Sequence, residues 1–240
     1  LKSSSIELQK LHAYSAKAMC VASPAALLKF SLGKLLPHLD KVLYLDGDII
    51  VCRDLMELYS LNLGADLVAA VPDSGKMRSK RPILHSVKAY FNSGVMLLNL
   101  AEMRRGGYAE RLLDAKRRSS DMSLMDQNVF NQVFNGRVRA LPIRYNCLFL
   151  NLIRAYAAKK FSFARLGKMY GVHYRNFSEL QEGASILHFA SKEKPWKYDR
   201  IPLGDLWDSY FRMSFCAGRR LDRVHADGAL ATFQFRNWFD

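Results

Sequence analysis

The sequence has no long apolar run: nowhere does it approach the roughly eighteen consecutive apolar residues that a membrane-spanning helix needs. Its first residues, Leu1 to Ser5, also lack the apolar core of a secretory signal. These absences predict a chain without a membrane span that works in the cytoplasm.

Closely spaced cysteines are missing as well. The four cysteines lie far apart and form no C-x-x-C pair, which argues against a zinc site and favours reduced thiols. Internal repeats, low-complexity tracts and linkers are also lacking. We therefore expect one main domain over residues 1–200, followed by a basic and aromatic helical appendage over residues 201–240.

Acidic residues are in the minority. The chain has 36 Lys and Arg against 22 Asp and Glu, a net charge of +14, which favours anionic partners. A basic nucleic-acid-binding protein is one reading of this charge. However, the basic clusters lack the interleaved aromatic residues of a single-strand groove and match no zinc-finger or RNP motif. We therefore expect no nucleic acid partner.

Short apolar runs alternate with amphipathic segments along most of the chain. The predicted strands are residues 42–45, 67–71, 95–98, 138–141 and 186–187. The predicted helices are residues 5–19, 24–36, 54–61, 100–118, 123–134, 154–170 and 205–215. This alternation predicts an α/β fold with an open, mostly parallel sheet and flanking helices.

The most informative motif is a pair of aspartates, Asp46 and Asp48, which directly follows the apolar run at residues 42–45. Ligands of open α/β sheets bind at the carboxyl ends of the strands. Carboxylates at i and i+2 in extended backbone point to one side, and a hard divalent cation relieves their mutual repulsion. The alternative is a polar strand end that leads into a turn.

Four ordered segments resemble the family-8 retaining glycosyltransferases, a group that includes bacterial lipopolysaccharide galactosyl- and glucosyltransferases and glycogenin. In chain order they are KVLYLDGDIIV at 41–51, YFNSGVMLLNL at 90–100, DQN at 126–128 and HFASKEKPW at 188–196. The resemblance implies a nucleotide-diphospho-sugar transferase fold of GT-A type. It also implies metal-dependent, retaining transfer of a hexose from UDP-glucose or UDP-galactose to a glycan acceptor such as lipopolysaccharide core.

The resemblance also assigns roles to residues. Asp46, Asp48 and His188 match the ligands of Mn²⁺ or Mg²⁺, and Lys194 matches a lysine that grips the donor diphosphate. For His188 the alternative is an ordinary, hydrogen-bonded histidine under a loop, and for Lys194 it is a solvated loop lysine.

Further donor contacts are implied for Lys29, Asn92 and Asp73. Lys29 aligns with an arginine that contacts donor phosphate, and its alternative is a solvated lysine. Asn92 would bond sugar hydroxyls or simply begin a strand. Asp73 would lie near the donor sugar or belong to a plain turn.

Asp126 and Gln127 match the pair that faces the anomeric carbon. Asp126 is also placed to cap a helix. Glutamine is a poor nucleophile, so we favour attack from the face of the leaving group, and the residues alone do not decide between this route and a covalent intermediate.

The chain departs from the family pattern in two further places. Ser191 replaces the glycine of the family's H-x-x-G, and the segment before Ser23 does not read as the family's N-terminal nucleotide-binding strand. The chain therefore has an alternative reading, an inactive or fragmentary homologue that binds metal or carbohydrate without turnover. The basic and aromatic C-terminal region predicts peripheral contact with the inner face of a membrane, or a helix packed on the domain.

Overall fold

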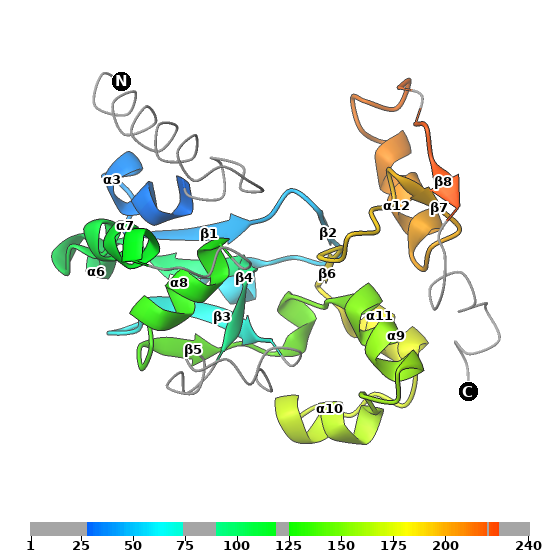
Figure 1. Cartoon of the computed structure of the whole chain (residues 1–240), viewed down its shortest axis with the longest axis horizontal. Coiled ribbons are helices and arrows are strands. Elements are labelled where there is room, and N and C mark those ends of the chain that lie inside the picture. The colour runs from blue at the N-terminus through cyan, green and yellow to red at the C-terminus, as the bar shows by residue number, and fades with distance from the viewer. Residues whose placement is uncertain (1–27, 74–89, 119–124, 220, 226–240) are drawn as a thin grey trace. The chain divides into compact units, whose positions relative to one another are not determined.

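The computed structural model describes residues 28–73, 90–118, 125–219 and 221–225 (Figure 1). Contacts divide the chain into two compact units. Unit 1 comprises Leu1–Tyr44 and Tyr59–Leu141, and unit 2 comprises Leu45–Leu58 and Pro142–Asp240. This grouping differs from the predicted boundary at residue 200, which stays a prediction. The predicted helix at 5–19 and the aromatic residues after 225 lie outside the described residues.

Unit 1 is built on a four-stranded sheet with the order β1-β4-β3-β5. Its strands are β1 (Lys41–Leu45), β3 (Val68–Pro72), β4 (Phe91–Asn99) and β5 (Val138–Ala140). β3 runs parallel to β5 but antiparallel to β4, so the sheet is mixed. The α/β class is confirmed. The direction of β4 was not predictable because a buried apolar run is compatible with either direction.

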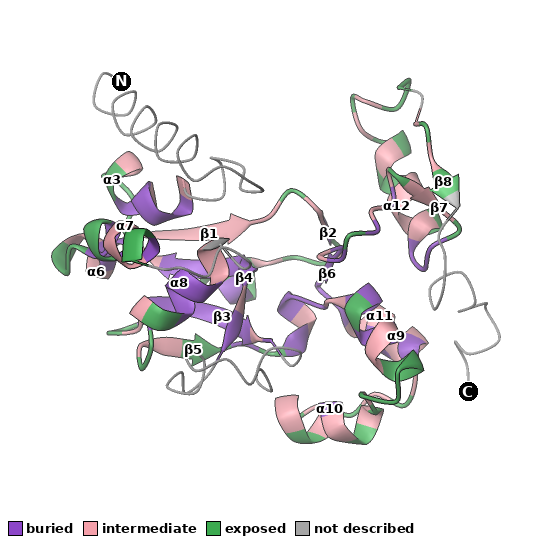
Figure 2. Ribbon diagram, in the orientation of Figure 1, coloured by how far each residue is buried: buried purple, intermediate pink, exposed green. Residues whose placement is uncertain are grey.

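The core of unit 1 lies along the two central strands. Residues 67–70 and 95–98 are fully buried, as the continuous buried colour on β3 and β4 shows (Figure 2). Phe30 packs edge-on against Phe130 with ring centroids 5.1 Å apart, which ties the segment before β1 to a helix that contacts β4. Burial on both sides explains why these strands read as unbroken apolar runs.

Several short helices accompany the sheet of unit 1. They are the 3-10 helix η1 (Lys29–Ser31), α3 (Leu32–Leu35), α6 (Leu100–Arg105), α7 (Tyr108–Arg118) and α8 (Met125–Val133). The single helix predicted over residues 100–118 is wrong, because it breaks at Gly106 and Gly107. Gly107 has φ +61°, and a Cβ on Gly106 would lie 2.4 Å from the Tyr108 ring. The break therefore requires glycine at both positions.

Unit 2 contains two small sheets. β2 (Ile49–Val51) pairs antiparallel with β6 (Ile186–His188), and Ile49 lies opposite His188. β7 (Tyr198–Asp199) pairs parallel with β8 (Val224–His225). The helical segments are η2 (Ile143–Tyr145), α9 (Phe149–Ala157), α10 (Phe163–Tyr170), α11 (Phe177–Gly183) and α12 (Gly204–Arg212). The short helix α4 (Met56–Tyr59) spans the division between the units.

The predicted helix over residues 154–170 is also two helices. Lys159 adopts φ +54°, and Ser162 then caps α10 by accepting a hydrogen bond from the Arg165 amide. The gap lets Phe161 and Phe163 pack against Phe177 in the core of unit 2. Within the described part of the chain, no helix is long and apolar enough to cross a membrane.

Candidate active site

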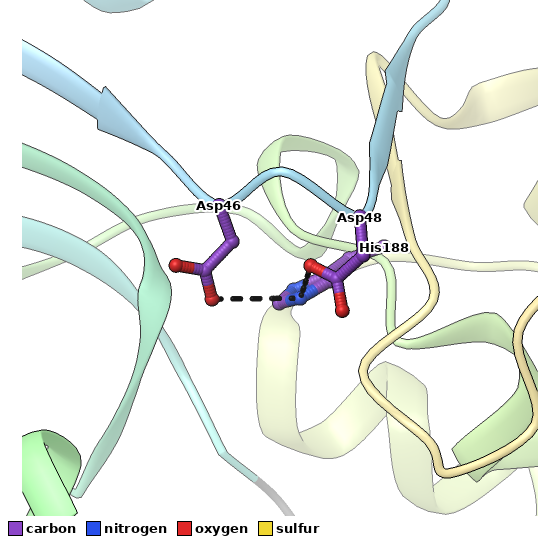
Figure 3. A group of neighbouring side chains, drawn as sticks. All are labelled: Asp46, Asp48 and His188. Atoms are coloured by element: carbon purple, nitrogen blue, oxygen red, sulfur yellow. Dashed lines mark ion pairs between the residues drawn. The ribbon is translucent and has the colours of Figure 1, made fainter. Parts of the chain in front are cut away.

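A carboxylate cluster, defined as Asp46, Asp48 and His188, lies in unit 2. Both aspartates precede β2, and His188 is the last residue of β6, so the β2–β6 pairing brings the three together. His188 Nε2 lies 3.1 Å from Asp48 Oδ1 and 3.8 Å from Asp46 Oδ2. Figure 3 shows both carboxylates turned towards the imidazole ring.

The orientation of the His188 ring is set by Asn146. His188 Nδ1 lies 2.8 Å from Asn146 Oδ1, and both side chains are buried. Because an amide oxygen only accepts, Nδ1 carries a proton, and Nε2 is the ring atom that faces the two carboxylates. The three ligand atoms lie within 4.8 Å of one another, and two carboxylates with one imidazole form a donor set that suits a divalent cation.

Lys194 completes the charge balance around Asp48. Its ammonium donates to Asp48 Oδ2 at 2.5 Å and to the Phe189 carbonyl at 2.5 Å. Burial raises the pKa of Asp48, but hydrogen bonds and positive charge from His188 and Lys194 outweigh that effect and hold the pKa well below its usual range. Lys194 is therefore not the solvated lysine of the alternative reading.

The loop between His188 and Lys194 accommodates the serine that replaces the family glycine. Ser191 is buried, and its hydroxyl donates to the Glu193 carbonyl at 3.1 Å. Its backbone is not in the left-handed region, so a side chain causes no strain there. Glu193 forms an ion pair with Arg154 of α9, which attaches the loop to the helical part of unit 2.

In unit 1, an ion pair with a buried lysine joins η1 to α8. Lys29 is 4% exposed, which contradicts the solvated-lysine alternative, and its Nζ lies 2.7 Å from Asp126 Oδ2. The same carboxylate oxygen accepts from Ser93 Oγ at 2.9 Å, and Lys29 Nζ also lies 4.5 Å from the centroid of the Tyr44 ring. Asp126 thus bonds to side chains that are remote in the sequence. A capping role at the start of α8 is compatible with these contacts.

Gln127 lies at the centre of a second set of contacts. Its Oε1 accepts from Asn92 Nδ2 at 3.0 Å and from the Ser93 amide at 3.4 Å. Its Nε2 lies 3.1 Å from Asp73 Oδ2 and 3.1 Å from the Tyr90 hydroxyl. Asp73 is buried. These contacts fix which way the amide of Gln127 points.

Two asparagines of α8 support this arrangement. Asn128 Oδ1 accepts from the Tyr90 hydroxyl at 2.7 Å. Asn131 accepts from the Phe91 amide at 2.8 Å and donates to the Phe91 carbonyl at 2.8 Å. We call the linked side chains the amide network, defined as Asp73, Tyr90, Asn92, Gln127, Asn128 and Asn131.

The structure thus places all the sequence-predicted residues in two polar groups. Unit 2 holds Asp46, Asp48, His188 and Lys194, and unit 1 holds Lys29, Asp73, Asn92, Asp126 and Gln127. Their roles stay predictions.

Sequence reasoning missed several supporting residues. Tyr90 and Ser93 lie inside the matched run at 90–100, and Asn131 lies one helical turn after Gln127, so a signal existed for these three. Nothing in the sequence around Asn146 pointed to it.

Comparison with known proteins agrees with this geometry. The profile of glycosyl transferase family 8 matches residues 2–200. The probable glycosyl transferase Gly of Streptococcus gordonii is 28% identical over 173 residues, 71% of this chain and 22% of that protein. The lipopolysaccharide 1,2-glucosyltransferase of Escherichia coli is 30% identical over 169 residues, 66% of this chain and 45% of that protein.

A solved structure gives the same result for the fold. The galactosyltransferase LgtC, crystallised with donor and acceptor sugar analogues, superposes with a TM-score of 0.59 at 25% identity. The match covers 74% of this chain and 62% of LgtC, which confirms the GT-A-like fold. The chain spans only 22% and 45% of the two curated relatives above. With the family profile matched over most of its length, the chain belongs to glycosyl transferase family 8.

Proposed function

We propose that this protein is a metal-dependent, retaining hexosyltransferase that moves glucose or galactose from a UDP-sugar to a glycan acceptor. The observation that carries the proposal is the carboxylate cluster, with the His188 ring held by Asn146 at 2.8 Å. The similarity to a lipopolysaccharide glucosyltransferase supports a lipopolysaccharide core, or a related surface glycan, as the acceptor.

Asp46, Asp48 and His188 would hold Mn²⁺ or Mg²⁺. Such an ion, when bound, supplies charge that stabilises a leaving diphosphate. Lys194 brings a second positive charge to Asp48, 2.5 Å from its carboxylate oxygen, and is the residue of unit 2 that we assign to the donor diphosphate. The bond that Lys194 also makes to the Phe189 carbonyl holds its chain along the loop.

The contacts of Gln127 favour attack from the face of the leaving group. A glutamine that acted as a nucleophile would use its amide oxygen, but Oε1 already accepts hydrogen bonds from Asn92 and the Ser93 amide. We therefore assign Gln127 and Asp126 to orienting the donor sugar. Asn92 and Asp73, both bonded to Gln127, would contact its hydroxyls, and Lys29 would supply positive charge beside Asp126.

Calorimetric titration of UDP, with and without Mn²⁺, tests the proposal. The wild type is expected to bind UDP in a metal-dependent manner, and an Asp46→Ala/Asp48→Ala variant is expected to lose this binding. Asp205→Ala, which removes an exposed carboxylate from the same unit, is the matched control. A folded wild type that binds no UDP would reject present activity and leave an inactive homologue. Metal-dependent binding would justify a screen of UDP-sugars and acceptors.

Contact with the inner face of a membrane also stays a proposal. The segment after α12 supports it, since Phe215 is fully exposed and Met213 is 74% exposed. Arg212 and Arg219 are exposed in the same segment. Basic and aromatic side chains together suit an anionic lipid surface. Co-sedimentation with anionic vesicles, compared with neutral ones, would test this contact.

A further inference from the structure

The segment that follows the family match is attached to the loop that carries Lys194. The family profile ends at residue 200, yet β8 pairs with β7 only four residues after Lys194. The Val224 amide donates to the Lys197 carbonyl at 2.9 Å. In turn, the amides of Lys197 and Tyr198 both donate to the Lys194 carbonyl at 2.9 Å. A continuous path of backbone hydrogen bonds therefore leads from β8 to Lys194.

Aromatic side chains form a second connection. Lys194 Nζ lies 5.9 Å from the Trp196 ring centroid, and Trp196 contacts Trp207 of α12 at 5.9 Å. Trp207 stacks on Phe211 at 5.0 Å with an interplanar angle of 14°. The guanidinium of Arg223 lies over the Trp207 ring at 5.3 Å. We call Trp196, Trp207, Phe211 and Arg223 the tryptophan clamp.

Two further contacts hold the clamp in place. Both terminal nitrogens of Arg223 donate to the Asp208 carboxylate, one of them at 2.9 Å. Such a bidentate pair fixes the plane of the guanidinium over the Trp207 ring. At the far end of α12, the Tyr210 hydroxyl donates to the Val51 carbonyl of β2 at 3.4 Å. Helix α12 is thus bonded to β2, the strand that follows Asp48. It also packs against Trp196.

We propose that the tryptophan clamp positions Lys194 for the second phosphate of the donor, so that residues beyond the family match belong to the diphosphate site. Trp207 and Arg223 are positioning residues in this proposal, because neither contacts Lys194 directly. The assignment rests on the proposed function, in which Lys194 contacts the diphosphate. The new element is that the affinity for the diphosphate depends on side chains from α12 and from the segment before β8.

The affinity difference between UDP and UMP measures this positioning, because only UDP has the second phosphate. We expect Trp207→Ala to weaken UDP binding about tenfold, by analogy with the lower end of the range for residues that hold a metal ligand in place, while UMP binding stays unchanged. Arg223→Gln, which removes the guanidinium but keeps a polar side chain, is expected to change UDP binding in the same direction. Trp207→Phe retains an aromatic ring against Trp196 and is expected to restore most of the affinity. Phe215→Ala removes a fully exposed aromatic of the same segment and is the matched control.

A double-mutant cycle with Lys194→Ala separates positioning from general destabilisation. If the clamp acts through Lys194, then Trp207→Ala has no further effect on UDP affinity once Lys194 is an alanine. Additive losses, equal losses for UMP and UDP, or unchanged UDP binding in both Trp207→Ala and Arg223→Gln would overturn the proposal.

Hydrogen exchange tests the effect of the tryptophan clamp on the Lys194 loop without a need for UDP binding. The amides of Lys197 and Tyr198 are expected to exchange faster in Trp207→Ala and Arg223→Gln, while those of β2 and β6 keep their protection. A wild type that binds no UDP would reject the proposed function alone. Faster exchange at these two amides would then still support the positioning of Lys194 by the tryptophan clamp, and unchanged exchange would overturn it.

Discussion

The amide network of unit 1 and the carboxylate cluster of unit 2 are held in different ways. The amide network consists mainly of neutral groups that bond to one another, and its Asn131 is fully buried with three hydrogen bonds to backbone groups. The carboxylate cluster places two half-buried acids around one imidazole, with an ammonium 2.5 Å from Asp48. The first arrangement depends on hydrogen-bond geometry, and the second depends on charge.

This difference fits the two tasks that we propose for these groups, to orient a sugar and to bind a diphosphate. Neutral, mutually bonded amides keep one orientation at any pH near neutrality, which suits groups that must orient a sugar. Acids that face a histidine and a lysine attract cations, which suits the binding of a charged leaving group. Perturbing each set should therefore affect different measurements.

The largest effect is expected from Asn131→Leu. The variant leaves the buried amide and carbonyl of Phe91 without their partner, and each such group costs about 1–3 kcal/mol. The free energy of unfolding should fall by about 3 kcal/mol in urea titrations followed by circular dichroism. Gln132→Leu, on the exposed side of the same helix, is the control. Equal stability of the two variants would show that the amide network does not hold α8 to β4.

A smaller effect is expected from Asn146→Leu, and it should appear in metal binding. Loss of the acceptor for His188 Nδ1 frees the ring to turn and to change tautomer. Mn²⁺ affinity, measured by calorimetry, should fall about tenfold, as is typical when a residue behind a metal ligand is removed. Asn151→Leu, at an exposed position of α9, controls for the substitution itself. Matching affinities in the two variants would remove Asn146 from the site.

The smallest effect is a dependence on acid in the metal-free protein. His188 and Lys194 lower the pKa of Asp48 in the folded state, despite the opposing effect of burial. The corresponding stability is present above the unfolded-state pKa of about 4 and is lost as pH falls towards the lower folded-state pKa. Urea titrations from pH 7 to pH 3 should show the difference in stability between wild type and Asp48→Asn shrinking only below about pH 4. A constant difference would mean that the charge of Asp48 contributes nothing to folding.

The sequence was informative about site residues that can be recognised from their immediate neighbours in the chain. Asp46 and Asp48 follow an apolar run directly, and that position favoured a cation site over a plain turn, a role that stays a prediction. The roles assigned to His188 and Lys194 came from the ordered motifs, and the structure brings both residues to Asp48.

Other features depend on partners that are remote in the chain. Asn146 bonds to a residue 42 positions away, and Lys29 to one 97 positions away, so no local pattern marks either contact. Helix breaks were missed for a different reason. Lys159 adopts a left-handed conformation that its residue type does not favour, because the aromatic packing around Phe177 outweighs the local preference.

The β2–β6 pairing has a consequence for biosynthesis and turnover. Asp48 and Lys194 are 146 positions apart, and residues 59–141 of unit 1 are made between the two segments of unit 2. The carboxylate cluster is therefore absent until synthesis has passed residue 188. A ligand that binds there recognises only the finished fold and draws the equilibrium away from opened forms. Proteases that cleave such forms would then remove the protein more slowly when that ligand is abundant.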